Sequence, residues 1–115
     1  DRHPELRIVL VHAGGYFPYQ AGRLRHARTV REELSNSPPD PLRYLDRLFF
    51  DIITHDPLAL EFLVHRVGSE QVVMGTDLPF DMAPPEPMEL LLSAVDEGAA
   101  HTIAERNPAS LYGLP

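Results

Sequence analysis

The sequence contains no cysteine and no lysine, and the absence of cysteine excludes whole classes of protein. Without cysteine it has no disulfide framework and no thiolate metal site. All 10 basic residues are arginine, and 17 acidic residues outnumber them, so that the net charge is −7 at pH 7. Because an acidic protein repels nucleic-acid phosphates and anionic lipid, we expect no nucleic acid and no membrane among its partners.

Long apolar runs are absent as well. No stretch approaches the roughly 18–20 apolar residues that cross a bilayer, and the charged N-terminal residues do not resemble a signal peptide. We therefore expect a cytoplasmic location. With 115 residues, of which 43% are hydrophobic, the chain has the length of one domain and enough apolar residues for a buried core.

Short apolar runs alternate with segments of helical character along the chain. Buried strands are predicted over residues 7–12, 48–53 and 72–76. Helices are predicted over residues 22–34, 57–67 and 87–97, followed by a helix at 99–107 and a terminal turn at 108–113. The alternation of strand and helix predicts an α/β fold with a parallel sheet.

Capping residues mark the predicted helix ends. Asp56 followed by Pro57 is a strong start signal for the second helix, and Gly68 is predicted to end it. Gly98 is predicted to end the third helix in the same way.

The predicted sheet is incomplete by itself. The strands are apolar on both faces, and helices on one side alone would leave the other side uncovered. A sheet of this size also leaves two open edges. We therefore expect the chain to be part of a larger α/β structure.

Titratable residues follow the predicted strands. His12 ends the first, His55 follows the second, and Asp77 follows the third. In parallel α/β sheets, functional groups gather at the carboxyl ends of the strands. A neutral imidazole and a carboxylate that converge there could hold a divalent metal, or act as a base and a metal ligand.

Each of these residues also has a structural interpretation. His12 could be a histidine that serves only the fold, and Asp77 could cap a helix or a loop turn before Pro79. A catalytic zinc site usually has about three protein ligands, and the sequence contains neither His-x-His nor His-Glu-x-x-His. The chain by itself is therefore short of metal ligands.

Four stretches of the sequence are distinctive: HAGGYFPYQAGRLRH (12–26), FFDIITHDPLALEFLVHRVG (49–68), VVMGTDLPF (72–80) and IAERNPASLYGL (103–114). Together they resemble the amidohydrolase-related (amidohydrolase 2) metal-dependent family, and within it the aminocarboxymuconate-semialdehyde decarboxylases and their decarboxylase and hydrolase relatives. The resemblance covers essentially the whole chain. The blocks His-Ala-Gly-Gly and Gly-Thr-Asp-x-Pro-Phe are quite specific when they occur together.

The resemblance implies a (β/α)8 TIM barrel, in which residues 1–115 are the C-terminal segment with strands six, seven and eight. It implies one divalent metal, usually Zn²⁺, with Asp77 as a direct ligand and His12 as the general base toward a metal-activated water. Arg23 matches an arginine that reaches a substrate carboxylate across a homodimer interface, a task that suits its planar fork. Phe80 matches an aromatic residue near the substrate.

Three further residues have less specific implied roles. Tyr16 and Phe17 line the same pocket or, as readily, pack in the core. His55 has a structural or supporting role near the site.

The implied function is that of a decarboxylase or hydrolase acting on a small carboxylated substrate. The first five strands and their histidine ligands are absent, so we expect a truncated product, a fragment or one segment of a longer polypeptide. The alternative is a non-catalytic α/β module without a complete metal site. A nucleotide-binding domain is disfavoured, because HAGGYF lacks the G-x-G-x-x-G spacing and no Gly-Lys-Ser/Thr phosphate loop occurs.

Overall fold

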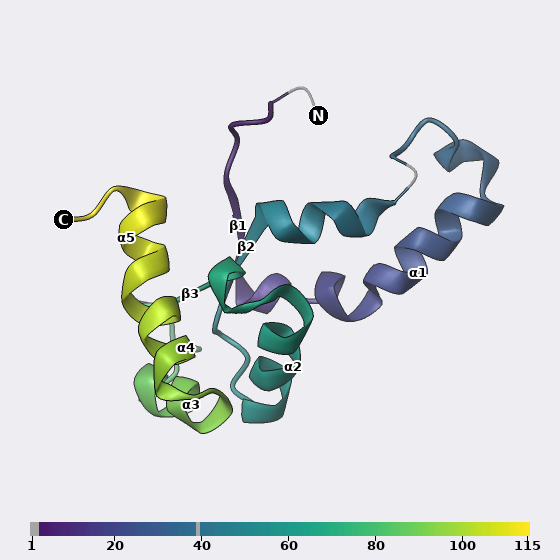
Figure 1. Cartoon of the computed structure of the whole chain (residues 1–115). Coiled ribbons are helices and arrows are strands. Elements are labelled where there is room, and N and C mark those ends of the chain that lie inside the picture. Colours follow the sequence, from purple (N-terminus) through teal and green to yellow (C-terminus); the bar gives the residue numbers. More distant parts are fainter. Residues whose placement is uncertain (1–2, 39) are drawn as a thin grey trace.

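Residues 3–38 and 40–115 are described by the computed structural model, and within them three parallel strands lie among helices (Figure 1). The strands are β1 (Ile8–Leu10), β2 (Leu48–Asp51) and β3 (Val72–Val73). They lie in the order β1-β2-β3, and each neighbouring pair is parallel. The predicted α/β class and parallel sheet are confirmed, although the hydrogen-bonded ladder is shorter than each predicted strand.

Helices surround the strands, with α1 to the right of them in Figure 1 and α5 to the left. The α-helices are α1 (Phe17–Val30), α2 (Pro57–Val67), α3 (Pro87–Ala94), α4 (Glu97–His101) and α5 (Asn107–Tyr112). A π-helical turn, η5 (Thr102–Arg106), joins α4 to α5. The 3₁₀ helices are η1 (His12–Gly14), η2 (Glu32–Leu34), η3 (Pro41–Arg47) and η4 (Ser69–Gln71). Among the described residues, no helix is both long and apolar enough to cross a membrane.

Helix α2 has the predicted ends. The Asp56 carboxylate accepts a hydrogen bond from the N–H of Leu58 at 2.9 Å, and Pro57 occupies the first turn. Gly68 follows the last helical residue with a φ of 84°, which favours glycine. These signals act within a few residues of one another, which explains why the sequence reveals them.

The other helix predictions were wrong at their ends, and residues 107–112, most of which were predicted as a terminal turn, form helix α5. Helix α1 begins at Phe17 rather than Gly22, because Pro18 starts it and Gly22 is tolerated inside it. It ends at Val30, and the remaining predicted residues form the separate turn η2. Gly98 does not end a helix: it lies inside α4, whose N-cap is Asp96, a carboxylate that accepts from the N–H of Ala99 at 2.8 Å.

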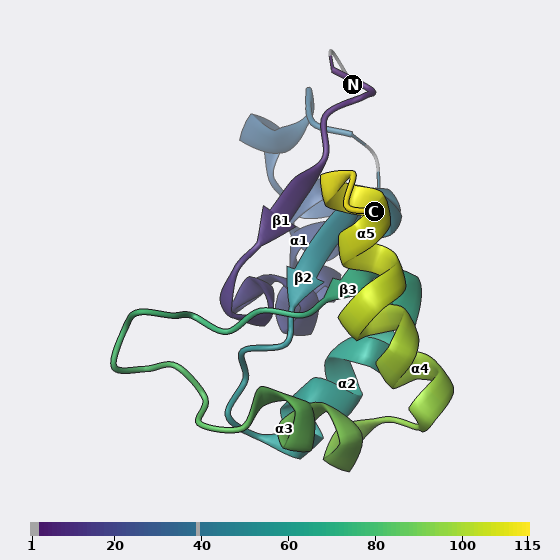
Figure 2. The same ribbon diagram turned by 90° about the vertical axis from the view of Figure 1, so that its left-hand side faces the viewer.

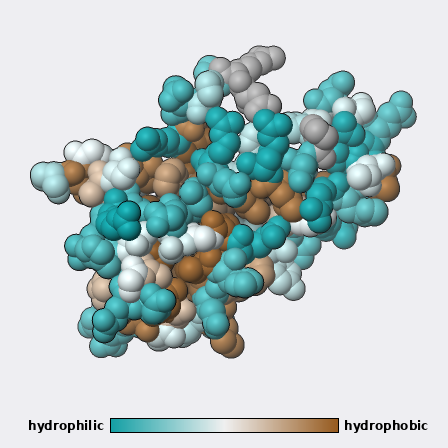
Figure 3. All heavy atoms as spheres, viewed as in Figure 1, coloured by the Kyte–Doolittle hydropathy of each residue, from teal (hydrophilic) through white to brown (hydrophobic). Residues whose placement is uncertain are grey.

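The core lies between the sheet and the helices. The largest fully buried side chains come from the central strand region, from α2 and from the C-terminal helices, and they include Phe50, Ile52, Leu60, Leu91 and Ile103. Apolar side chains are also visible in the middle of the face that Figure 3 shows, bordered by polar ones.

Strand β1 is less buried than predicted. Burial on both faces holds for β3 and for the end of β2, but the side chain of Ile8 in β1 is 41% exposed. Strand β1 lies at the edge of the sheet, where no further described strand covers it.

Candidate functional site

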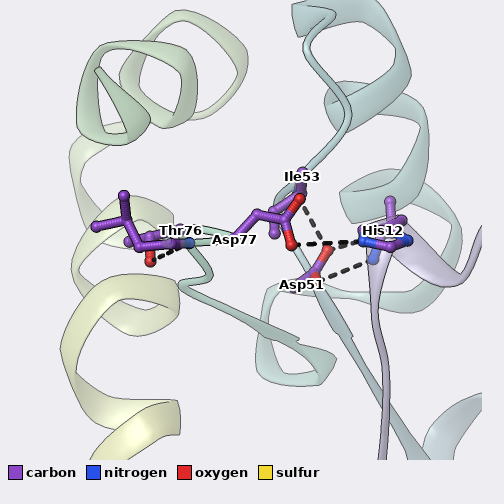
Figure 4. A network of polar contacts seen from close by, with 7 residues as sticks. His12, Asp51, Ile53, Thr76 and Asp77 are labelled. Carbon is purple, nitrogen blue, oxygen red and sulfur yellow. Dashed lines mark hydrogen bonds and ion pairs between the residues drawn. The ribbon is translucent and has the colours of Figure 1, made fainter. Parts of the chain in front are cut away.

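Three titratable side chains meet at the carboxyl ends of the strands (Figure 4). His12 follows β1, Asp51 is the last residue of β2, and Asp77 lies in the segment after β3. The Nε2 atom of His12 lies 3.6 Å from Oδ1 of Asp77. The His12 side chain is 62% exposed and that of Asp77 is 17% exposed. The two predicted site residues are therefore brought together, from segments that are distant in the sequence.

A left-handed turn carries His12. Its φ is 53°, and the next residues continue with positive φ: Ala13 at 55°, Gly14 at 71° and Gly15 at 54°. At Gly14 a Cβ would come within 2.7 Å of the Phe50 ring, so this glycine is required by space as well as by conformation. The turn therefore packs directly onto β2.

The Asp51 carboxylate accepts hydrogen bonds from that turn. Its Oδ2 accepts from the N–H of His12 at 2.9 Å, and its Oδ1 accepts from the N–H groups of Ala13 at 2.7 Å and Ile53 at 3.0 Å. The residue is only 4% exposed. Sequence reasoning missed Asp51 and counted it as a strand residue. The available signal was a carboxylate inside the apolar run FFDII, because buried carboxylates are rare unless their oxygens are paired.

The segment after β3 passes close to Asp51. A Cβ at Gly75 would lie 2.9 Å from Cβ of Asp51, so only glycine permits this approach without a shift. The N–H of Met74 donates to the Ile103 carbonyl at 3.0 Å, which attaches the start of the segment to the π-helical turn η5. Residues 74–86 then extend away from the sheet before α3 begins (Figure 2).

Two cavities border His12. One, of about 570 Å³, is lined mainly by α1, α2 and the residues that precede α2, including Tyr19 and Phe62. The other, of about 640 Å³, lies over the strand ends and is lined by Asp51, Asp77 and Phe80 as well as His12. The structure thus places the predicted substrate residue Phe80 on the same cavity as the predicted base and metal ligand.

The other residues singled out from the sequence lie outside both cavities. Arg23 is exposed on α1, and its predicted contact with a substrate carboxylate stays a prediction. Phe17 packs against the core, but Tyr16 is 65% exposed, so the core interpretation was wrong for Tyr16. His55 is exposed and has a φ of 55°.

The donor atoms at the strand ends suit a divalent transition metal. Imidazole nitrogen and carboxylate oxygen both bind Zn²⁺ and Mn²⁺. Within the described ranges 3–38 and 40–115, no group of three or more His, Asp or Glu side chains is placed to hold a metal ion. The described part of the chain therefore supplies the pair His12 and Asp77 as candidate donors.

Comparison with known proteins identifies the family. The family described as amidohydrolase matches residues 1–114. The chain belongs to the amidohydrolase family. A curated relative, 2-amino-3-carboxymuconate-6-semialdehyde decarboxylase of Dictyostelium discoideum, is 36% identical over 95 residues, which are 81% of this chain and 26% of the relative. The resemblance seen in the sequence motifs is confirmed, and the chain spans about a quarter of that relative's length.

Solved amidohydrolase-family structures share the fold. The 5-carboxyvanillate decarboxylase of Sphingomonas paucimobilis superposes with a TM-score of 0.85 at 24% identity, covering all of this chain and 36% of that one. A dihydroxybenzoic acid decarboxylase of Polaromonas sp. JS666, solved with bound manganese and an inhibitor, gives 0.79 at 20% identity, covering 99% of this chain and 36% of that one. In both cases the similarity lies in the arrangement of the strands and helices.

Proposed function

We propose that this chain forms one side of the active site of a metal-dependent decarboxylase that acts on a small carboxylated substrate. The observation that carries the proposal is the pairing of His12 with Asp77 over a cavity at the strand ends, in a chain 36% identical to a decarboxylase. Functional groups of parallel α/β sheets gather at this end.

Residues 1–115 are the last three βα units, strands six to eight, of a (β/α)8 barrel in this proposal. The strands are parallel and consecutive in space, and the chain covers about a third of each solved decarboxylase that it matches. The exposed residues of β1 then belong to an edge that a preceding strand covers, which accounts for the 41% exposure of Ile8.

Asp77 is the proposed metal ligand of this chain. Its carboxylate is mostly buried, it borders the larger cavity, and it faces the His12 imidazole. The manganese in the Polaromonas structure supports a divalent metal, and Zn²⁺ suits the same donor types. When bound, the metal supplies a Lewis acid that acidifies water and withdraws charge from substrate oxygens.

His12 is the proposed proton-transfer residue. When CO₂ leaves, the electron pair of the broken carbon–carbon bond stays on the substrate carbon. That carbon must take up a proton, and an imidazole exchanges protons readily near neutral pH. The exposed ring of His12 borders both cavities, so Nε2 can accept a proton and return it on the substrate side.

Arg23 and Phe80 are the proposed substrate contacts. Phe80 is exposed on the larger cavity and offers an apolar wall to an unsaturated substrate. Arg23 lines neither cavity of its own chain, so its proposed bond to a substrate carboxylate requires a homodimer in which α1 reaches the partner's cavity.

Decarboxylation is preferred to hydrolysis because the three relatives described above are all named decarboxylases. Hydrolysis of an ester, lactone or amide is the second candidate, since the family is described as amidohydrolase and the same residues can act on water.

A chimera tests the proposal. The stretch of the Dictyostelium decarboxylase that this chain matches is replaced by this chain, and CO₂ release from 2-amino-3-carboxymuconate-6-semialdehyde is measured with Mn²⁺ or Zn²⁺ added. We expect metal-dependent CO₂ release, which Asp77→Ala abolishes together with metal binding. A folded chimera that binds metal yet releases no CO₂ from this substrate or from carboxylated phenols contradicts the proposal and favours the non-catalytic module.

A further inference from the structure

We propose that Asp51 is a positioning residue, whose carboxylate holds the turn after β1 so that the His12 ring lies beside Asp77. The catalytic consequence rests on the proposed function, but the positioning itself is a statement about this chain alone. The positioning role is inferred from the hydrogen bonds and packing of Asp51, a residue to which the proposed function gives no role.

The bonds of Asp51 act on the peptide groups that flank His12. One oxygen accepts from the N–H of His12 and the other from the N–H of Ala13, so that both successive donors point at one buried anion. Hydrogen bonds to an ionised acceptor are stronger than those between neutral groups. The carboxylate therefore stabilises a left-handed conformation that neither His12 nor Ala13 favours by itself.

Asp51 has little freedom to move. Its third bond comes from the N–H of Ile53, which attaches it to its own strand end. Gly75 of the β3 segment approaches so closely that a Cβ there would meet Cβ of Asp51 at 2.9 Å. The turn itself sits on Phe50, the residue that precedes Asp51. One side chain thus joins the carboxyl ends of all three strands, from which the site residues come.

The His12 ring depends on this turn for its position. Asp77 is the polar partner found for the ring among the described residues, and the 3.6 Å separation is too long for a strong hydrogen bond. With most of the ring in solvent, its place is set by the backbone. An error of about 1 Å in such a group can lower a rate by about 10²-fold.

Two Asp51 variants test the positioning. Asp51→Ala removes both acceptor oxygens, and Asp51→Asn keeps the size but replaces one oxygen with a donor. The control is Asp96→Ala, which removes the acceptor of a backbone N–H at the start of α4. Amide hydrogen exchange of the 115-residue chain is measured by NMR, and the His12–Asp77 separation is measured from a crystal structure of each variant.

We expect the His12 and Ala13 amides to exchange at least about tenfold faster in both Asp51 variants, with the ring displaced from Asp77. The Leu60 amide inside α2 serves as an internal reference, and Asp96→Ala should change only the amides near α4. Unchanged exchange at His12 and Ala13, or a ring still beside Asp77 in Asp51→Asn, overturns the inference. If Asp51→Ala does not fold, the exchange rates and crystal structure of Asp51→Asn alone decide whether Asp51 positions the His12 ring.

Kinetics of the chimera separate this inference from the proposed function. In an active chimera, Asp51→Asn should lower kcat by about 10²-fold with KM little changed, because both oxygens of Asp51 already accept backbone N–H groups of the protein. Faster exchange with an unchanged kcat contradicts the positioning role in catalysis. If the unmodified chimera is inactive, the proposed function fails, and the exchange and the crystal structures still decide the positioning.

Discussion

Asp51 ends β2 and Asp56 caps α2, and both accept backbone N–H groups, yet they stabilise different levels of structure. Asp56 is exposed and accepts from Leu58, two residues further along the chain. Asp51 is buried and accepts from His12 and Ala13, which are 39 and 38 residues away in the sequence. The first carboxylate starts a helix, whereas the second joins two strand ends.

The difference predicts unequal energetic consequences. Removing an exposed cap lets water satisfy the freed N–H, so the loss is modest. Removing the buried acceptor leaves N–H groups without partners and also frees a turn that is strained by itself. The four stability predictions below test this contrast, from the largest expected effect to the smallest.

Asp51→Ala should lower the free energy of unfolding by about 3 kcal/mol, because one buried and two part-buried N–H groups lose a charged acceptor. Urea denaturation followed by circular dichroism measures the change. A loss below about 1 kcal/mol would mean that water replaces the carboxylate, and the two aspartates would then be equivalent.

Gly14→Ala should lower the free energy of unfolding by about 2 kcal/mol, since the new Cβ meets the Phe50 ring and the φ is positive. Gly113→Ala is the matched control: its φ of 66° and ψ of 34° are left-handed, but nothing lies within 4 Å of the added Cβ. Gly113→Ala should therefore cost only about 1 kcal/mol, the conformational part alone. Equal losses in the two variants would show that the turn does not press on β2.

Gly75→Ala should lower the free energy of unfolding by about 1.5 kcal/mol through overpacking against Asp51. In an Asp51→Gly background the loss should shrink, because glycine lacks the Cβ that the new methyl group meets. Thermal denaturation of the four proteins of this cycle measures the coupling. If the stability losses of the two single variants add up to that of the double variant, the β3 segment and residue 51 do not interact.

Asp56→Ala should lower the free energy of unfolding by about 1 kcal/mol, the usual loss of a helix N-cap. Amide exchange should accelerate in the first turn of α2 and stay unchanged at His12. Faster exchange at His12 would show that this cap also supports the site, and the distinction between the two aspartates would disappear.

The same contrast explains what the sequence could reveal. The sequence predicts the ends of α2 from Asp56, Pro57 and Gly68, because each of these residues acts on neighbours near in the chain. It predicts His12 and Asp77 as site residues because they follow predicted strands. The carboxylate inside the apolar run FFDII was a local signal that Asp51 is paired, but two of its three partners, His12 and Ala13, lie in another βα unit and could not be read from the sequence. Pro18 was a local signal for the start of α1 that the prediction passed over in favour of Gly22.

Strand burial shows the same limit. The apolar composition of residues 7–12 predicts burial on both faces, but neighbours decide burial. Strands β1 and β3 both lie at an edge of the described sheet, yet β3 is buried, and the N–H of Met74 just after it donates to η5. The exposed side chain of Ile8 thus reflects what packs against β1 and not the strand sequence.

His12 is proposed to transfer the proton in a decarboxylation at the strand ends. The rate of CO₂ release by the chimera with His12→Asn, measured beside its Mn²⁺ affinity, tests this role. We expect kcat to fall by about 10²-fold or more with metal still bound. An unchanged kcat in the variant would mean that His12 does not transfer the proton.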